Sequence, residues 1–239
     1  KNTTEAGSVP KSCSVVFFPA YMSWLSGIYF PFCLWYIYPI VDGDVRNRNT
    51  GDTGMYTWEE IERHVNSCTA CSLCRTRKHP VMGQGDHKGK LMLVAEAPGG
   101  QEDLAGVPFV GPAGKVLDEL LASVEIRRED IYITNILKCH PPGNRDPLEE
   151  EKEACMPYLK YETYLMKPRI IVCLGRVAAQ RLIDPNYRIT RQHGTWIERK
   201  GCFLTATYHP SALLRDPSKM EDGKRDFRAI KEKLQTLRD

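Results

Sequence analysis

The segment "LMLVAEAPGGQEDLAG" spans residues 91–106 and joins a wholly apolar run to a polar, glycine-rich turn. The apolar run, residues 91–95, is typical of a strand that is covered on both faces of a sheet. The two adjacent glycines that follow allow a tight turn whose backbone can approach a ligand closely. The segment therefore predicts a buried strand with a functional loop at its carboxyl end.

Similar apolar runs recur along the chain, with helical patterns between them. Three further runs rich in β-branched or aromatic residues occupy residues 131–137, 169–175 and 203–209. The segment 112–124 places apolar residues at helical spacing on one face, namely Val116, Leu117, Leu120, Leu121 and Val124. Alternating strands and helices predict an α/β domain with a mainly parallel sheet.

Other helices are expected in the second half of the chain. Residues 176–183 should form a helix after the third strand, and residues 225–237 an amphipathic surface helix. Because proline removes a backbone donor from a helix interior, Pro157 is expected to end a short helix near Cys155 and to open another that runs to about Met166.

The first 54 residues differ in composition from the rest. No charged residue occurs in residues 12–41, which are long enough to span a bilayer, since about 20 apolar residues suffice. Three prolines interrupt this run, however, and no Lys/Arg cluster flanks it. Residues 1–54 are interpreted as a membrane segment, as non-native upstream sequence or as an apolar arm packed on the domain. Residues 55–239 form the predicted domain.

Composition limits the function only weakly. The chain has 239 residues, of which 42% are hydrophobic and 26% charged, and its net charge is +3. These values suit one globular domain with an appendage. The mildly basic charge permits nucleic-acid binding without arguing for it. We expect a cytoplasmic monomer with no obligate protein partner, with membrane attachment through residues 12–41 as the alternative.

Nine cysteines are too few for a disulfide scaffold of this length, and their number is odd. The run "CTACSLC" contains Cys68, Cys71 and Cys74, a spacing that favours metal or cluster ligation over disulfides in an intracellular protein. Cys139 and Cys155 bracket a polar, proline-rich segment, and their spacing alone allows a disulfide, a metal site or two unrelated core thiols. The remaining cysteines are interpreted as structural or as part of the extension: Cys173, Cys202, Cys13 and Cys33.

Polar loops rich in glycine or proline follow three of the predicted strands. They occupy residues 96–103, 139–147 and 209–217. In open α/β sheets a ligand binds at the carboxyl ends of the strands, so these loops predict a site at that edge. Asn135, inside an apolar strand, can present a donor and an acceptor to a flat heterocycle, and His209 can donate a hydrogen bond to a leaving group.

Taken together, these motifs resemble the iron–sulfur uracil-DNA glycosylases, often called family 4. The matching motifs are "EAPG…ED", "PFVG-AG", "TNILKC-PPGNR-P" and "HPSALLR", and they occur in order between Thr57 and the C-terminus. The N-terminal domain of a phage-polymerase-related family is similar too. The resemblance implies a three-layer α/β/α fold with a central four-stranded, mainly parallel sheet. It also implies a DNA-repair hydrolase that flips uracil out of single- or double-stranded DNA and cleaves its N-glycosidic bond, leaving an abasic site.

The same resemblance implies a role for each motif residue. A [4Fe–4S] cluster would be held by Cys68, Cys71, Cys139 and Cys155. Structural zinc is the rival metal and Cys74 a competing ligand. Phe109 would stack on the base, Asn135 would bind its Watson–Crick edge, and Ala97 and Gly99 would line the pocket. His209 would stabilise the departing uracil. Glu96 would position water or stabilise the sugar cation, with Glu102 and Asp103 ranked second. DNA phosphates would be contacted by Gly111, Ser211 and Arg215.

Three alternatives differ from turnover of uracil. A covalent uracil-capturing relative carries a basic, histidine-containing loop, for which His140 is the sole candidate in the loop between Asn135 and Cys155. A non-catalytic nucleic-acid-binding or phage-polymerase-associated module would bind DNA without releasing base. The third alternative is the same enzyme class acting on another base, such as hypoxanthine or a thymine mispair. Ala97 stands where a glycine is often found in the family, and this difference would alter the base pocket.

Overall fold

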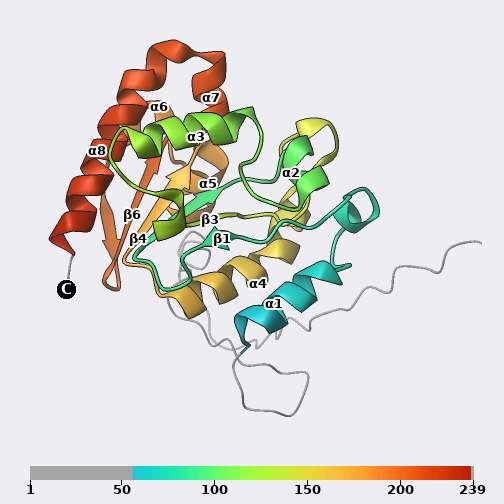
Figure 1. Cartoon of the computed structure of the whole chain (residues 1–239). Helices are drawn as coiled ribbons and strands as arrows, with labels where there is room; N and C mark the ends of the chain where they lie inside the picture. Colours follow the sequence, from blue (N-terminus) through green and yellow to red (C-terminus); the bar gives the residue numbers. More distant parts are fainter. Residues whose placement is uncertain (1–55, 238–239) are drawn as a thin grey trace, which may run out of the picture.

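A six-stranded sheet forms the centre of the structure, a computed structural model that describes residues 56–237 (Figure 1). The strand order is β1-β3-β2-β4-β6-β5. The strands are β1 Gln84–Gly85, β2 Leu91–Ala95, β3 Tyr132–Asn135, β4 Ile170–Leu174, β5 Ile197–Arg199 and β6 Cys202–Thr207. The apolar extension predicted over residues 1–54 lies outside the described residues.

The four inner strands are parallel, as the sequence predicted. Strand β2 pairs with β3 and β4, and β4 pairs with β6, all in parallel register. Nearly every residue of these strands is buried, which explains why they are continuous apolar runs. The short outer strands β1 and β5 are antiparallel and were not predicted, because runs of two and three residues leave no periodic signal.

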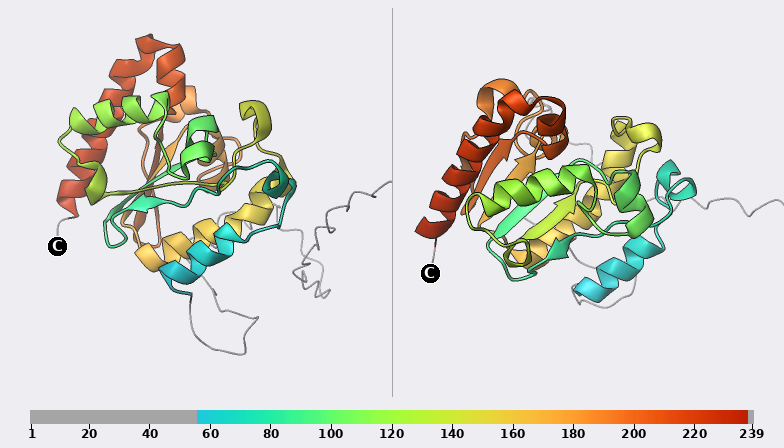
Figure 2. Two further views of the ribbon diagram at one scale, coloured as in Figure 1. Left: turned by 45° about the vertical axis from the view of Figure 1, so that its right-hand side comes forward. Right: turned by 45° about the horizontal axis from the view of Figure 1, so that its top comes forward.

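Helices cover both faces of the sheet and complete the predicted three layers (Figures 1 and 2). One face packs against α3, α7 and α8, through side chains such as Leu117, Leu213 and Phe227. The other face packs against α4 and α5, through side chains such as Leu159 and Ala178. The helices are α1 Trp58–Asn66, α2 Gly100–Ala105, α3 Pro112–Ala122, α4 Glu149–Met166, α5 Arg176–Leu182, α6 Ile189–Gln192, α7 Pro210–Arg215 and α8 Met220–Thr236.

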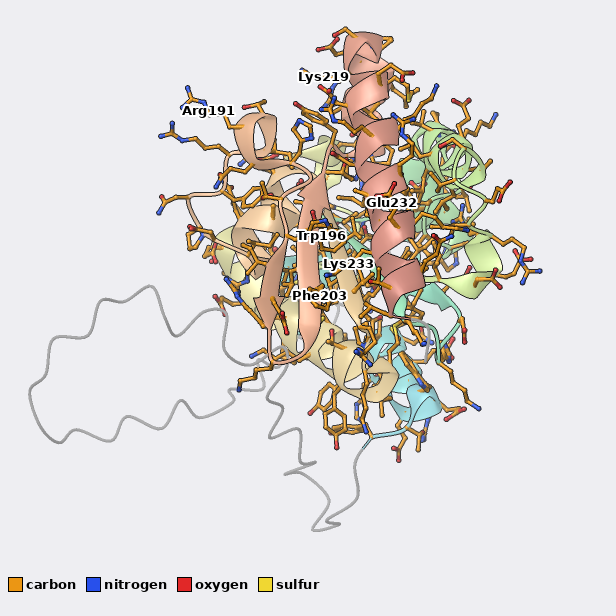
Figure 3. The ribbon with its side chains drawn as sticks, turned by 90° about the vertical axis from the view of Figure 1, so that its left-hand side faces the viewer. Arg191, Trp196, Phe203, Lys219, Glu232 and Lys233 are labelled. Carbon is orange, nitrogen blue, oxygen red and sulfur yellow. The ribbon has the colours of Figure 1, made fainter. Side chains whose placement is uncertain are left out.

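Helices α3, α5 and α8 match the predicted segments. In α3 the predicted apolar face is buried, and Val124 is buried just beyond the end of the helix. Helix α8 begins at Met220, earlier than predicted, and lies along the sheet with Lys233 over the ring of Phe203 at 3.6 Å (Figure 3). The Lys233 ammonium group over the ring face makes a cation–π contact between the helix and the sheet.

The predicted break at Pro157 was wrong. Helix α4 continues through Pro157 from Glu149 to Met166. An interior proline costs a helix about 3 kcal/mol, because one hydrogen bond is lost. Here Cys155 and Met156 before it and Leu159 after it are buried. Met156 and Leu159 pack against the sheet, and Cys155 packs with Leu137 and Cys139. Tertiary burial of both halves therefore outweighs the local penalty.

No helix within residues 56–237 combines the length and the apolar character that a membrane span requires. The membrane segment that was considered for residues 12–41 falls outside the part of the chain that the structure describes.

Gly114 allows the loop that precedes α3 to fold back onto the helix. A Cβ atom at this position would lie 1.9 Å from the carbonyl oxygen of Phe109, which is far inside van der Waals contact. Phe109 itself has a left-handed backbone with φ of 55°, an uncommon conformation for a bulky residue. The close packing at Gly114 therefore fixes the loop that carries Phe109.

We expect Gly114→Ala to lower the free energy of unfolding by at least about 1 kcal/mol, since the backbone must move to admit the methyl group. Gly100→Ala is the matched control, because it is also a helical glycine but has nothing within 4 Å of an added Cβ. It should leave stability unchanged or slightly increased. Urea unfolding of both variants measures the difference, and equal stabilities would contradict the role given to Gly114.

Candidate active site

A cavity of about 600 Å³ opens at the carboxyl ends of the four parallel strands. Each of these strands supplies a residue at or just after its end: Glu96 after β2, Asn135 on β3, Gly175 after β4 and His209 after β6. The cavity is thus where the sequence predicted it, and its volume is in the range of small-molecule pockets. Most residues predicted for substrate and DNA contact line it: Glu96, Ala97, Gly99, Glu102, Phe109, Gly111, Asn135, His209, Ser211 and Arg215.

Phe109 provides an aromatic wall of the cavity. Its side chain is only 6% exposed, and its ring lies 5.9 Å from that of His209 with an angle of 28° between the planes. Arg128 donates a hydrogen bond to the carbonyl oxygen of Phe109 at 3.0 Å and a second to that of Pro108. Together with the contact at Gly114, these bonds hold the left-handed backbone of Phe109 in place.

Asn135 is nearly inaccessible, with an exposed fraction of 2%, although it lines the cavity. It is the last residue of β3 and stands in register with Ala95, the last residue of β2. A buried amide needs hydrogen-bond partners for its donors and its acceptor. Its position at the end of a strand gives it a fixed backbone from which to meet a planar ligand.

The local structure fixes the tautomer of His209. The residue caps α7, and its Nδ1 accepts a hydrogen bond from the backbone N–H of Ser211 at 3.1 Å. Burial, and then the nearby charge of Arg215, lower the pKa of His209 to about 4. At neutral pH the ring is therefore uncharged with Nδ1 unprotonated, so its proton is on Nε2 and available for donation.

Glu96 is a half-buried carboxylate at the same edge. Burial, and then repulsion from Asp146, raise the pKa of Glu96, while Arg176 opposes the shift. Asp146 and Arg176 form an ion pair at 2.8 Å beside it, and both line the cavity. Neither residue was predicted from the sequence. Arg176 follows Gly175 at the end of the third strand, so the same rule that selected the other three loops could have found it.

Glu102 and Asp103, the second-ranked acids, are engaged in backbone hydrogen bonds. Glu102 Oε1 accepts from the N–H of Gly111 at 2.8 Å. Asp103 is 5% exposed and accepts from the N–H of Lys78 through both oxygens, at 3.0 and 3.1 Å. Both carboxylates therefore stabilise loops. Gly99 packs closely here, because a Cβ at its position would lie 2.6 Å from Glu102 Oε2.

The rim residues predicted to contact DNA differ in how free they are. The N–H of Gly111 is bound by Glu102, and Ser211 contacts His209 through both its N–H and its hydroxyl. Arg215 is exposed at the end of α7, next to Leu214, which is 45% exposed. An exposed apolar side chain beside an arginine suits contact with unstacked bases and phosphate.

Two residues of the loop after β3 bind the protein itself. Arg145 makes a two-pronged ion pair with Glu151, at 2.6 and 2.8 Å, and the Glu151 side chain is fully buried. His140 Nδ1 lies 2.9 Å from the carbonyl oxygen of Pro98, which can only accept, so this nitrogen donates. The contact of His140 holds the loop next to the turn that contains Ala97 and Gly99, and that of Arg145 holds the loop to α4.

The four predicted cluster cysteines line a second, smaller cavity. Cys68 and Cys71 lie in the segment that follows α1, Cys139 lies after β3, and Cys155 is on α4. Cys139 and Cys155 are buried and the other two partly so. Cys74 lines the same cavity and therefore stays a competing ligand. Ala97 lines the larger cavity and also packs against the cluster that contains Cys139 and Cys155, so it lies between the two cavities.

Hydrogen-bond donors point at two of these sulfurs. Arg77 donates to Cys139 Sγ at 3.2 Å, and the N–H of Lys138 donates to Cys155 Sγ at 3.2 Å. Burial raises the pKa of Cys71 to about 11 and that of Cys155 to about 12. All seven cysteines in residues 56–237 are free thiols, and within that range no three His, Cys, Asp or Glu side chains are grouped as for a single metal ion.

Cys173 and Cys202 are buried among apolar side chains on the α4 face of the sheet. Their positions agree with the structural role predicted for them. Cys13 and Cys33 belong to the part of the chain that the structure does not describe.

The site combines an aromatic wall, a buried amide, a neutral imidazole donor and a carboxylate with a raised pKa. Such a set can bind a planar heterocycle and stabilise an anion that leaves from it. Sequence comparisons point the same way. The family model described as "Uracil DNA glycosylase superfamily" matches residues 82–235.

Curated relatives extend this match to most of the domain. The Type-4 uracil-DNA glycosylase of Archaeoglobus fulgidus is 46% identical over 186 residues, which cover 74% of this chain and 94% of the relative. The Type-4 enzyme of Pyrobaculum aerophilum is 40% identical, covering 71% and 90%. That of Thermotoga maritima is 42% identical, covering 69% and 88%. The chain therefore belongs to the uracil DNA glycosylase superfamily.

Proposed function

We propose that this protein is a DNA-repair glycosylase that releases uracil from DNA by hydrolysing its N-glycosidic bond. The family assignment supports this function, and one structural observation carries it. His209 is held as a neutral donor through Nε2, in the same cavity as the buried amide of Asn135 and the ring of Phe109. This is the arrangement that recognition of a neutral base and departure of its anion require.

Base recognition would take place in the cavity at the sheet edge. Since uracil inside a duplex is inaccessible, its nucleotide must first rotate out of the stack. The ring of Phe109 would stack on the flipped base, and the amide of Asn135 would pair with its Watson–Crick edge. Backbone groups of Ala97 and Gly99 would line the remaining side. The fixed backbones of Phe109 and Asn135 limit the pocket to a flat heterocycle.

Bond cleavage would develop negative charge on uracil and positive charge on the sugar. The Nε2–H of His209 is the donor we assign to uracil O2 as the anion forms. Glu96 is the carboxylate we assign to the sugar side, where it can stabilise the cation and orient water. Its pKa, raised by burial, strengthens the carboxylate as a proton acceptor.

DNA would approach the cavity over its rim. Arg215 and the exposed Leu214 on α7 are free to meet phosphate and bases. Ser211 and Gly111 lie at the same rim, and their role would be to shape it, because their polar groups contact His209 and Glu102. Contacts with phosphate depend on the charges at the rim and not on the net charge of the chain, which is modest. They are expected to weaken as the salt concentration rises.

The small thiol cavity suits a [4Fe–4S] cluster held by Cys68, Cys71, Cys139 and Cys155. Four cysteines from three separate segments surround it, and Arg77 and the Lys138 N–H donate to its sulfurs, a feature that tunes iron–sulfur sites. A bound cluster would join these segments and so order the loop next to the base pocket. Structural zinc is the alternative, because four thiolates bind it as well.

Removing the imidazole donor should slow uracil release. We expect His209→Ala to lower kcat by about 10²–10³, the usual effect of losing one donor to a developing anion. His209→Asn should retain part of the activity, because its amide can still donate. Release of free uracil from a uracil-containing oligonucleotide gives the rates. A wild-type rate in His209→Ala would contradict the assignment, and a stable protein–DNA adduct would indicate covalent capture instead.

The pH profile of kcat should show no step for His209 near the ordinary pKa of histidine. Because the pKa of His209 is lowered to about 4, the ring stays neutral as pH falls from about 8 to about 5. We expect the step due to His209 only as pH falls through about 4, where the ring gains a proton and Nδ1 can no longer accept. The loss of kcat that comes first as pH falls belongs to Glu96, because burial raises the pKa of its carboxyl group. The pH profile of wild type, compared with His209→Asn, measures this.

Glu96 and Glu102 can be separated by one matched substitution. Glu96→Gln should lower kcat by about 10² or more, since an amide can neither accept a proton nor stabilise a cation. Glu102→Gln should stay within about fivefold of wild type, because an amide oxygen can still accept from the Gly111 N–H. The opposite ranking would move the carboxylate role to Glu102.

Metal content identifies the occupant of the thiol cavity. After anaerobic purification we expect iron and sulfide in equal amounts with visible absorption, and Cys155→Ser should lose both the iron and thermal stability. Cys74→Ser should retain the iron if the proposed four cysteines are the ligands. Zinc in place of iron would favour the structural zinc alternative, and loss of iron in Cys74→Ser would make Cys74 a ligand.

A further inference from the structure

Lys138 and Glu162 form an ion pair in the interior of the domain. The Lys138 Nζ lies 2.7 Å from Glu162 Oε2, and the two side chains are 1% and 0% exposed. Lys138 comes three residues after Asn135, and Glu162 is on α4, which packs beneath β3 (Figures 1 and 2). Neither residue has a role in the mechanism proposed above.

Every donor of the Lys138 ammonium group has a partner. It donates to Glu162 Oε2 at 2.7 Å, to Thr134 Oγ1 at 2.7 Å and to the carbonyl oxygen of Asn135 at 2.8 Å. The carboxylate of Glu162 is equally well occupied. It accepts from Thr134 Oγ1, from the Tyr132 hydroxyl and from the N–H of Gly83. The pair is therefore the centre of a closed network around the end of β3.

Stability alone is a weak reason for such a pair. Removing two charges from water costs about as much as their attraction returns, and apolar residues often replace buried pairs without loss. Buried ionic groups can instead select one arrangement among several. This network ends on the carbonyl oxygen of Asn135, so the arrangement that it selects is that of the Asn135 backbone.

The bond from Lys138 fixes the peptide that follows Asn135. Asn135 is the last residue of β3, and the N–H of the peptide that follows it, that of Ile136, donates to the carbonyl oxygen of Ala95 at 2.9 Å. The Lys138 ammonium group holds the other side of this peptide, the Asn135 carbonyl oxygen, at 2.8 Å. Because a buried carbonyl needs a partner, loss of the ammonium group would let the peptide rotate about the remaining bond from Ile136. Rotation would redirect the Asn135 side chain, and a misplacement of about 1 Å can cost about 10²-fold in rate.

We infer that Lys138, held by Glu162, is the positioning residue for Asn135. The role rests on the proposed function, in which Asn135 binds the base. The backbone of Lys138 is also fixed on both sides: its N–H donates to Cys155 Sγ at 3.2 Å, and its carbonyl accepts from the N–H of Val81 at 2.7 Å. Lys138 thus joins the base pocket to the wall of the thiol cavity.

The test uses Lys138→Met together with Glu162→Gln in the full chain. The double substitution removes both charges but leaves an amide oxygen for Tyr132 and Gly83. It should therefore fold, with a Tm close to that of wild type and unchanged metal content. Even so, kcat/KM for uracil release and affinity for a uracil-containing oligonucleotide should fall about tenfold or more, because the Asn135 carbonyl has lost its donor.

A double-mutant cycle separates positioning from general damage. The same pair of changes made in an Asn135→Ala background should cost less than about twofold further, since the side chain that it positions is already absent. Lys160→Met, the same substitution at a half-buried lysine of α4 outside this network, should leave both measurements unchanged.

Three results would overturn the inference. One is wild-type kcat/KM and affinity in the charge-free double variant. Another is an equal fractional loss in the Asn135→Ala background, which would make Lys138 a structural residue only. If the wild-type protein neither binds nor cleaves uracil-containing DNA, the proposed function fails and this role fails with it, whereas additivity in an active enzyme removes the role of Lys138 alone.

Discussion

The parallel register of the four inner strands is the constraint on which the rest of the site depends. Because β2, β3, β4 and β6 run in one direction, their carboxyl ends meet at one edge of the sheet. Glu96, Asn135 and His209 are far apart in the sequence and come together there. An antiparallel neighbour would place one of these ends on the opposite edge. The packing of helices on both sheet faces holds the register, since a slip by one residue would move every side chain of a strand to the opposite face and disrupt its packing there.

The sequence predicted the parts of the structure that periodicity and turn chemistry record. Four apolar runs, the amphipathic helix at 112–124 and the polar loops after three strands were enough for the fold class and the position of the cavity. Pro157 was misjudged because local propensity reports the cost of a proline but not the burial on either side of it. Strands β1 and β5 are too short to leave any pattern.

Partner choice was less predictable than residue type. The motifs identified Glu102, Asp103 and Gly111, yet only the folded arrangement shows that Glu102 binds the N–H of Gly111 and that Asp103 binds that of Lys78. Asp146 and Arg176 meet across 30 positions of sequence, which no local pattern encodes. Long-range pairs of this kind decide which carboxylate remains free, and here that carboxylate is Glu96, whose pKa burial raises.

The left-handed backbone of Phe109 has a consequence for how tightly a base can be bound. Arg128 and the close packing at Gly114 hold this unfavourable conformation in the folded protein, before any nucleotide enters. Loops that must become ordered around a ligand reduce its affinity by the entropy that they lose. A ring that is already immobile loses little, so more of the stacking free energy remains to offset the unpairing of the extruded nucleotide.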